Sequence, residues 1–160
     1  MRSYYRNFLI RDWQKQDCTL ASAVIRDVLT EYGLPWEPMG ADRDVLEVEK
    51  HYIEAGGEFW VVEKEKKIVG TAAYYPIRRG KLAVEIRKMY LLPLVRGKGL
   101  GNYLLQELEK AIFSRGFQEI WLETASVLQE AVNLYEKSGY QATTGVETTR
   151  CDRIYVKQIN

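Results

Sequence analysis

The chain has 160 residues, of which 46% are hydrophobic and 28% are charged, and its formal net charge is +1. This composition is ordinary for a globular protein and excludes a disordered chain. The near-zero net charge provides no global field that could hold nucleic acid or an acidic membrane surface, so we expect neither partner. We predict a single domain over residues 1–160, in which a local cluster of charges must hold any bound anion.

The two cysteines, Cys18 and Cys151, lie near opposite ends of the chain and lack the spacing of metal ligands. They predict two reduced thiols and no metal site. Residues 1–6 lack the apolar core of a signal peptide, and no run approaches the roughly 18 apolar residues that a membrane span requires. Together these features favour a cytoplasmic protein.

The first third of the chain predicts one strand and two helices. The strand covers residues 8–13, and a first helix is capped by Asp17 and stops at Gly33. A loop with two prolines, residues 34–40, leads to a second helix that begins near Asp42. The side chains expected on the buried face of this second helix are Val45, Val48, Tyr52 and Ile53. This helix–loop–helix block precedes the main sheet, where it can form one wall of a cleft.

From Glu58 the hydrophobic period becomes that of strands. Successive strands are predicted over residues 59–62, 68–75 and 82–91, with the second closed by Pro76. The charged turns between them are typical of solvated hairpin tips, so we expect the three strands to form an antiparallel meander.

The last part of the chain alternates helices and strands. A helix with leucines at helical spacing ends near Gly116. Residues 118–124 predict a strand and residues 128–138 another helix; the chain from Tyr140 is strand-like until Gly145 breaks it, and residues 153–157 predict a last strand. Strand, glycine loop, helix and strand in this order form a crossover unit, which joins parallel strands. Because the unit follows an antiparallel meander, the predicted fold is α/β of the α+β type, with a mixed, mostly antiparallel central sheet flanked by helices.

A glycine-rich loop, Arg96-Gly97-Lys98-Gly99-Leu100-Gly101, lies between the third strand of the meander and the next helix. Glycines let a ligand approach the backbone closely, and the start of a helix directs free N–H groups and a positive dipole end into the loop. Arg96 and Lys98 add two positive charges at the same place. The loop therefore suits a phosphate group, and a basic surface turn is the alternative. The familiar nucleotide motifs do not fit, because no Ser or Thr follows Lys98 and Asn102 replaces the last glycine of the dinucleotide fingerprint.

The order of elements and this loop together resemble the GNAT superfamily of acyl-CoA-dependent N-acetyltransferases. The family's pyrophosphate-binding signature has Gln or Arg, then Gly three residues later, then Gly or Ala two residues after that, and residues 96–101 satisfy every fixed position. Residues 85–93 look like the family's central strand and its exit. Residues 131–140 look like its late helix, with the pattern A-x-x-L-Y-x-K-x-G-Y. The resemblance covers residues 59–140.

This resemblance implies that acetyl-CoA lies in a gap where the central strand splays from the strand at residues 119–124. It also implies that backbone groups around Met89, Tyr90 and Leu91 bond the pantetheine arm as if it were a further strand. The family's pyrophosphate contacts fall here on Arg96, Gly97, Lys98, Gly99, Leu100 and Gly101. One position departs from the family, because Leu128 stands where relatives often carry an asparagine that contacts the cofactor.

Acyl transfer from a thioester to an amine needs a base for the incoming ammonium and a proton donor for the leaving thiolate. Glu85 on the central strand is the candidate base, with Glu123 in reserve, and a strand glutamate in an ion pair is the alternative. If no bulge intervenes, Glu85 shares its face with Arg87 and Met89. Tyr135 matches the family's tyrosine that protonates the thiolate, and a core tyrosine is the alternative. A backbone N–H near Met89 would polarise the thioester carbonyl.

The acceptor pocket is expected at the loop around Trp36, the second helix, the turn at residues 78–81 and the residues after Tyr140. Candidates for an aromatic wall are Trp36, Tyr52 and Trp60, and burial in the core is the alternative for each. Arg87 can pair a substrate carboxylate, and His51, the sole histidine, is expected to be structural.

The sequence thus predicts a transferase that moves the acetyl group of acetyl-CoA to a primary amine of a small molecule or amino-acid-like substrate, by direct attack on the thioester. Two alternatives stay open: acetylation of a protein or peptide amine, and a non-catalytic acyl-CoA-binding or regulatory module. The choice between acetyl-CoA and a longer acyl-CoA is also open, and a homodimer is a further possibility.

Overall fold

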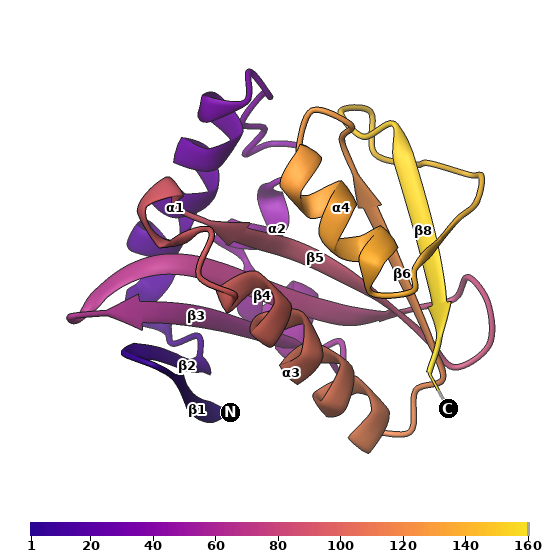
Figure 1. Cartoon of the computed structure of the whole chain (residues 1–160), viewed down its shortest axis with the longest axis horizontal. Coiled ribbons are helices and arrows are strands. Elements are labelled where there is room, and N and C mark those ends of the chain that lie inside the picture. The colour runs from indigo at the N-terminus through magenta and orange to yellow at the C-terminus, as the bar shows by residue number, and fades with distance from the viewer. Residues whose placement is uncertain (160) are drawn as a thin grey trace.

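In the computed structural model, which describes residues 1–159, an eight-stranded sheet carries helices on both faces (Figure 1). The strands are β1 (Arg2–Tyr5), β2 (Phe8–Asp12), β3 (Glu58–Lys64), β4 (Lys67–Ile77), β5 (Ala83–Leu91), β6 (Glu119–Thr124), β7 (Gln141–Ala142) and β8 (Arg153–Gln158). The helices are α1 (Cys18–Glu31), α2 (Arg43–Leu46), α3 (Leu100–Ser114) and α4 (Gln129–Lys137), with a π-helical turn η2 (Glu49–Ile53) and 3₁₀ turns η1 (Lys15–Asp17) and η3 (Pro93–Val95).

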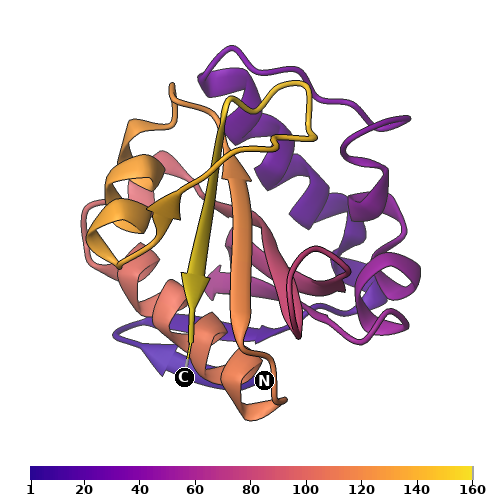
Figure 2. The ribbon, with the colours of Figure 1, turned by 90° about the vertical axis from the view of Figure 1, so that its right-hand side faces the viewer.

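The strand order is β1-β2-β3-β4-β5-β6-β8-β7, and only β5 and β6 run parallel to each other among the described pairs. The predicted meander and the predicted parallel crossover through α3 are both confirmed. Figure 2 shows α3 and α4 on one side of the sheet and α1 on the other. The mixed, mostly antiparallel fold class predicted from the sequence is therefore correct.

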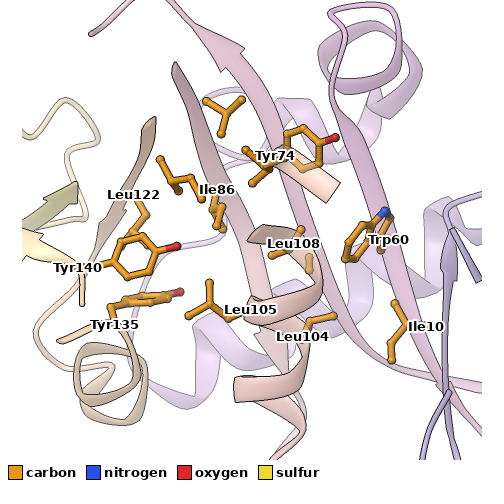
Figure 3. Packing of buried hydrophobic residues seen from close by; sticks show 14 of the residues in the cluster. Ile10, Trp60, Tyr74, Ile86, Leu104, Leu105, Leu108, Leu122, Tyr135 and Tyr140 are labelled. Atoms are coloured by element: carbon orange, nitrogen blue, oxygen red, sulfur yellow. The ribbon is translucent and has the colours of Figure 1, made fainter. Parts of the chain in front are cut away.

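Two hydrophobic clusters, one on each face, hold the helices against the sheet. On one face Leu104, Leu105 and Leu108 of α3 pack towards Ile86 of β5, and Tyr135 of α4 joins the same cluster (Figure 3). On the other face α1 and η2 cover the sheet with residues that include Ile25, Leu29, Val48, Tyr52 and Phe59. The leucine spacing of α3 thus places its apolar stripe on the sheet, as the sequence indicated.

The predicted second helix is broken into two short pieces. Glu47 leaves the helical region between α2 and η2, with φ −133° and ψ 49°. Val45, Val48 and Tyr52 are buried as expected, but Ile53 is 49% exposed, so its predicted burial is wrong. The wider π-helical turn changes the angular phase of the residues that follow, which explains why the 3.6-residue period fails at Ile53.

Other boundaries differ at the edges of the sheet. Strand β1 is not signalled by the sequence, and it pairs with β2 as a terminal hairpin. Strand β4 continues past Pro76 to Ile77. Strand β3 pairs with β4 only as far as Tyr74, so at Pro76 strand β4 has a neighbour on one side only. A proline, which lacks an N–H, is tolerated at such an edge position. After Tyr140 only Gln141 and Ala142 are extended before an irregular loop.

Strand β5 contains a bulge at Lys88, whose φ is +55°. Opposite it, Thr71 pairs with Tyr90 and Ala73 with Arg87, so β5 has one residue more than β4 in this stretch. The buried Thr71 hydroxyl donates a hydrogen bond of 2.7 Å to the Lys88 carbonyl. The bulge changes which residues share a face, and Met89 packs in the α3 cluster beside Ile86. The condition for Glu85 and Met89 to share a face, an unbroken strand, is therefore not met, because the bulge shifts the two-residue alternation by one.

Candidate functional site

Strands β5 and β6 are joined along only part of their length. Their pairing runs from Ala83 to Ile86 of β5, and beyond Ile86 the two strands diverge beneath α4 (Figure 1). From Arg87 onward, no strand within residues 1–159 pairs with this edge of β5, which leaves backbone polar groups available to a ligand. The predicted gap between the central strand and β6 is thus present.

A cleft runs from the glycine loop along this free edge to α4, and we call it the outer cleft. Seven of the predicted cofactor residues line it: Met89, Tyr90, Leu91, Arg96, Gly97, Gly99 and Gly101. The other two predicted contacts lie elsewhere, because the side chain of Lys98 is exposed to solvent and that of Leu100 is buried in the core. Only the backbone of Leu100 can face a ligand at the loop.

The glycine loop has the backbone geometry that its glycines permit. Gly97 and Gly99 have φ angles of +73° and +81°. The positive φ favours glycine at position 99, and a Cβ there would lie 2.6 Å from the hydroxyl of Tyr5 and would displace it from its hydrogen bond to the Lys98 carbonyl. Helix α3 begins at Leu100 without a side-chain cap, so its first N–H groups keep their capacity to bind an anion.

Arg96 does not contribute a free cation to the loop. Its guanidinium makes hydrogen bonds of 2.6 and 2.8 Å to the two carboxylate oxygens of Glu31 at the end of α1, and its Nε donates to the Leu91 carbonyl at 2.9 Å. Glu31 thus neutralises one of the two cations expected from the sequence. The arginine instead ties the loop to α1 and to the end of β5, which fixes one wall of the outer cleft.

Adjoining the outer cleft is a deeper space between β5 and β6, which we call the inner hollow. It consists of two small hollows that share Arg87, Glu123 and Cys151 as walls, with Tyr135 lining the one next to the outer cleft and Glu85 lining the other. The two spaces meet at a common wall formed by Met89, Tyr90, Leu128, Ala131 and Tyr135. Both cysteines are free thiols, and burial raises the pKa of Cys151 to about 11, which keeps that thiol protonated.

Tyr135 reaches this common wall from α4. Its side chain is packed edge-on against the Tyr140 ring, and only 6% of the residue is exposed. Within residues 1–159 its hydroxyl has no hydrogen-bond partner of its own. Burial raises the pKa of Tyr135 above its ordinary value, so the phenol stays protonated and remains a donor.

The two candidate bases stand in different surroundings. Burial raises the pKa of Glu85, although the charge of Arg87 opposes this, and the Tyr75 hydroxyl donates to Glu85 at 3.2 Å. The carboxylate of Glu123 instead accepts N–H bonds from Glu147 at 3.1 Å and Thr148 at 2.9 Å, so it anchors the loop after β7. Glu85 is therefore the carboxylate with more freedom to accept a proton.

A buried group of charges, not foreseen from the sequence, closes the far side of the inner hollow. The fully buried Asp42 accepts hydrogen bonds from Lys88 at 2.6 Å and from both Nη atoms of Arg150 at 2.5 and 2.7 Å. Burial alone would raise the Asp42 pKa, but the bonds from Arg150 and the charge of Lys88 lower it to about 2. The partners lie 46 and 108 residues from Asp42, so no local pattern signals this group.

The expected aromatic wall of the acceptor pocket is not formed. Tyr52 and Trp60 are each only 1% exposed and belong to the two cores, and Trp36 packs against the α1 cluster. Arg78 and Arg79 of the predicted turn do line a hollow next to Glu85. His51 lies beside Glu47, with 3.0 Å between Nε2 and a carboxylate oxygen, which fits its expected structural role.

Within the described residues, no helix is long and apolar enough to cross a membrane. Residues 1–159 also contain no group of three or more His, Cys, Asp or Glu side chains that could hold a metal ion.

Comparison with known proteins places the chain in a family. The model of the acetyltransferase (GNAT) family matches residues 23–140. An uncharacterised N-acetyltransferase of Escherichia coli, YjgM, is 38% identical over 130 residues, which cover 79% of this chain and 77% of that protein. Rat N-acetyltransferase 8F1 is 28% identical over 117 residues, and the match covers 69% of this chain and 53% of that protein. The chain thus spans about half the length of the rat relative.

Solved structures share the fold at low sequence identity. A GNAT acetyltransferase of Staphylococcus aureus superposes with a TM-score of 0.88 at 17% identity, covering 96% of this chain and 99% of its own. The structure of yncA from Salmonella typhimurium with acetyl-CoA superposes with a TM-score of 0.76 at 21% identity, covering 97% of this chain and 95% of its own. The matched family model, the identity to YjgM and the shared fold together show that this chain belongs to the GNAT family of acyl-CoA-dependent N-acyltransferases.

Proposed function

We propose that this enzyme transfers the acetyl group of acetyl-CoA to the primary amine of a small, amino-acid-like molecule. The observation that carries the proposal is the common wall of the two spaces, where Tyr135 faces both the outer cleft and the inner hollow. A thioester held in the outer cleft would meet an amine held in the inner hollow at this wall.

The outer cleft fits a coenzyme A thioester in two ways. The uncapped first turn of α3 and the glycine loop suit a pyrophosphate group. The free edge of β5 from Arg87 to Leu91 suits an extended arm that carries amides, because such an arm can bond unpaired N–H and C=O groups as a strand does. Leu128, at the position where relatives often carry asparagine, adds an apolar contact to the same cleft.

Glu85 serves as the general base in this proposal. An amine reaches the enzyme as an ammonium at neutral pH, so its attack on the thioester carbonyl requires loss of a proton. The carboxylate of Glu85 accepts that proton, directly or through a water molecule. Its raised pKa makes it a stronger base than an exposed glutamate, which supports this role.

Tyr135 serves as the proton donor to the departing thiolate. The attack of the amine nitrogen forms the new C–N bond and an oxyanion, which a backbone N–H on the free edge of β5 near Met89 stabilises. The oxyanion then reforms the carbonyl as the C–S bond breaks, the Tyr135 hydroxyl gives its proton to the sulfur, and the remaining extra proton of the amide nitrogen passes to the Tyr135 phenolate. Because this hydroxyl has no other partner within residues 1–159, it is available for that bond.

Release of free thiol from acetyl-CoA, scored against a panel of small primary amines and short peptides, tests the proposal. We expect thiol release that depends on at least one small amine. Turnover with peptides alone would move the acceptor to the protein or peptide class. Tight binding of coenzyme A without turnover of any amine would support the non-catalytic alternative and contradict the proposal.

A further inference from the structure

Arg87 on β5 is held more loosely than the other partly buried arginines. Its nearest carboxylate oxygens are 3.8 Å from Nε, on Glu85, and 4.0 Å from Nη1, on Asp44. Its guanidinium donates a long hydrogen bond of 3.4 Å from Nη2 to the Ala41 carbonyl, and it lies over the ring of Tyr75, 5.8 Å from the ring centroid. Charge-assisted hydrogen bonds between guanidinium and carboxylate are typically about 2.7–2.9 Å long, so Arg87 makes none.

Three other arginines each donate two short hydrogen bonds to a single carboxylate. Arg11 donates two hydrogen bonds to Asp17 at 2.8 and 2.9 Å. Arg96 does the same to Glu31, and Arg150 to Asp42, at 2.5 to 2.8 Å. Arg87 has no such forked partner, although its side chain is only 22% exposed. A half-buried guanidinium without a fork partner retains donors in the geometry that binds a carboxylate.

The position of Arg87 allows a ligand to reach it. Its side chain lines the inner hollow and also a hollow at the rim, where Glu37, Ala41 and Thr148 are among its neighbours. The neighbouring carboxylates cannot move to it freely. Asp44 is engaged by the Tyr52 hydroxyl and lies 3.4 Å from Lys88. Arg87 is therefore a cation that faces open space inside the site.

Arg87 and Glu85 together form a matched pair of charges on one face of β5. Glu85, the proposed base, would receive the ammonium of an acceptor, and Arg87 lies two residues further towards the gap. An amino acid carries an ammonium and a carboxylate separated by one carbon, so one small molecule can satisfy both groups. A plain amine would leave the guanidinium without a partner in a half-buried site, which is unfavourable.

We infer that the acceptor is an amino acid with a free carboxylate, and that Arg87 binds this carboxylate and thereby selects the substrate. The inference rests on the proposed function, since it names the acceptor class of the same site. Arg87 acts on binding and orientation of the acceptor, and takes no part in the proton transfers.

Matched acceptors test this inference. Each amino acid of a panel is compared with its carboxamide and with the amine that lacks the carboxyl group, by thiol release from acetyl-CoA. We expect the wild-type kcat/KM to be at least about tenfold higher for the amino acid. In Arg87→Gln it should fall about 100-fold for the amino acid, mainly through KM, and stay within about threefold for the carboxamide. Arg87→Lys should recover part of the loss.

Controls separate selection from damage to the fold. Arg43→Gln removes an exposed arginine on α2 that pairs with Glu47 at 3.5 Å, and it should leave the preference for the amino acid unchanged. Coenzyme A should bind Arg87→Gln as tightly as wild type. Equal turnover of all three acceptor types by the wild type, or an equal loss for all three in Arg87→Gln, would overturn the inference and leave the acetyltransferase activity standing.

A binding measurement keeps the two proposals distinguishable. Calorimetric titration of the enzyme–coenzyme A complex with amino acids and their carboxamides does not depend on turnover. Preferential binding of the amino acid, lost in Arg87→Gln, supports the inference even if no acceptor is acetylated. Absence of that preference contradicts it whatever the activity.

Discussion

Among the buried tyrosines, Tyr135 differs from those whose hydroxyls are committed to carboxylates. Tyr52 donates to Asp44, Tyr140 to Glu109 at 3.0 Å and Tyr155 to Glu136 at 2.7 Å. Each of those bonds satisfies a polar group that folding has buried. The Tyr135 hydroxyl makes no such bond in residues 1–159, and the residue lines both spaces of the site.

Substitution of Tyr135 should therefore lower the rate of acetyl transfer and leave the stability of the fold unchanged. Tyr135→Phe leaves no buried partner unsatisfied, so we expect an unchanged melting temperature and unchanged coenzyme A affinity, with kcat reduced about 100-fold. Tyr52→Phe is the matched control, because it strands the Asp44 carboxylate and should cost about 1–3 kcal/mol of unfolding free energy. An unchanged kcat in Tyr135→Phe would remove Tyr135 from the mechanism.

If Glu85 is the general base, its raised pKa determines how the activity of the enzyme changes with pH. A general base works when deprotonated, so wild-type activity should fall as the pH falls through the raised pKa of Glu85. Glu85→Gln should lower kcat about 100-fold or more near pH 7, and the deficit should shrink at high pH as the amine deprotonates in solution. The pH–rate profiles of both proteins measure this. A deficit that stays constant across the range would argue for a structural role.

Glu123→Gln provides the comparison. Its carboxylate accepts N–H bonds from the loop, and a glutamine oxygen can accept part of them. We expect a smaller loss of kcat, with no change in its pH dependence.

At the scale of elements, the turn from β5 into α3 depends on which glycine is replaced. Gly99 has φ +81°, and a Cβ there meets the Tyr5 hydroxyl, whereas a Cβ on Gly101 makes only ordinary contacts of 3.6 and 3.8 Å. Gly99→Ala should destabilise the protein by about 1–2 kcal/mol and weaken coenzyme A binding at least tenfold. Gly101→Ala should be stabilising by about 0.5–1 kcal/mol within α3. Thermal unfolding and calorimetric titration check both, and identical effects of the two substitutions would refute this account of the loop.

The same elements show which parts of the fold the sequence could predict. The leucine spacing of α3, the glycine loop before it and the strand after it are local patterns, and they sufficed to predict the parallel crossover of β5 and β6. The bulge at Lys88 has no such signal, because a lysine at an alternating strand position looks solvent-exposed. Its side chain is instead 2% exposed. The register between β4 and β5 defines the bulge, and this register depends on the pairing of two strands.

The candidate site likewise has one part that the sequence predicts and another that it does not. Sequence motifs pointed to the residues that line the outer cleft, since each lies in a continuous segment with a recognisable pattern. They could not show that Arg96 is paired with Glu31, or that Tyr52 and Trp60 are core residues. Such facts depend on which distant segments meet, and hydrophobic periodicity carries no information on that point.

At the scale of the whole molecule, Asp42 ties together three distant segments. It binds Lys88 in β5 and Arg150 in the loop before β8, and it accepts an N–H bond from Glu37 at 2.9 Å in the loop after α1. Residues from both halves of the chain thus meet at one carboxylate beside the inner hollow. The loop that Arg150 holds also supplies the partners of Glu123.

This arrangement predicts how stability changes in acid. The pKa of Asp42 is about 2 in the fold against 3.8 for an unperturbed aspartate, so its contribution to stability is fully present above about pH 4 and is lost as the pH falls towards 2. From these values we expect the difference in unfolding free energy between wild type and Asp42→Asn to narrow by about 2 kcal/mol between pH 5 and pH 2. Denaturant titrations at the two pH values measure it. A difference that is independent of pH would contradict the assigned ion pairs.

The proposed chemistry depends on the reactive end of the donor lying at the wall shared by the outer cleft and the inner hollow. A crystal structure of the enzyme with acetyl-CoA tests this claim most directly. We predict that the pyrophosphate lies at the first turn of α3, that the pantetheine arm follows β5 past Tyr90, and that the sulfur lies within hydrogen-bonding distance of the Tyr135 hydroxyl. A thioester positioned outside this cleft, or turned away from Tyr135 and the inner hollow, would contradict the account.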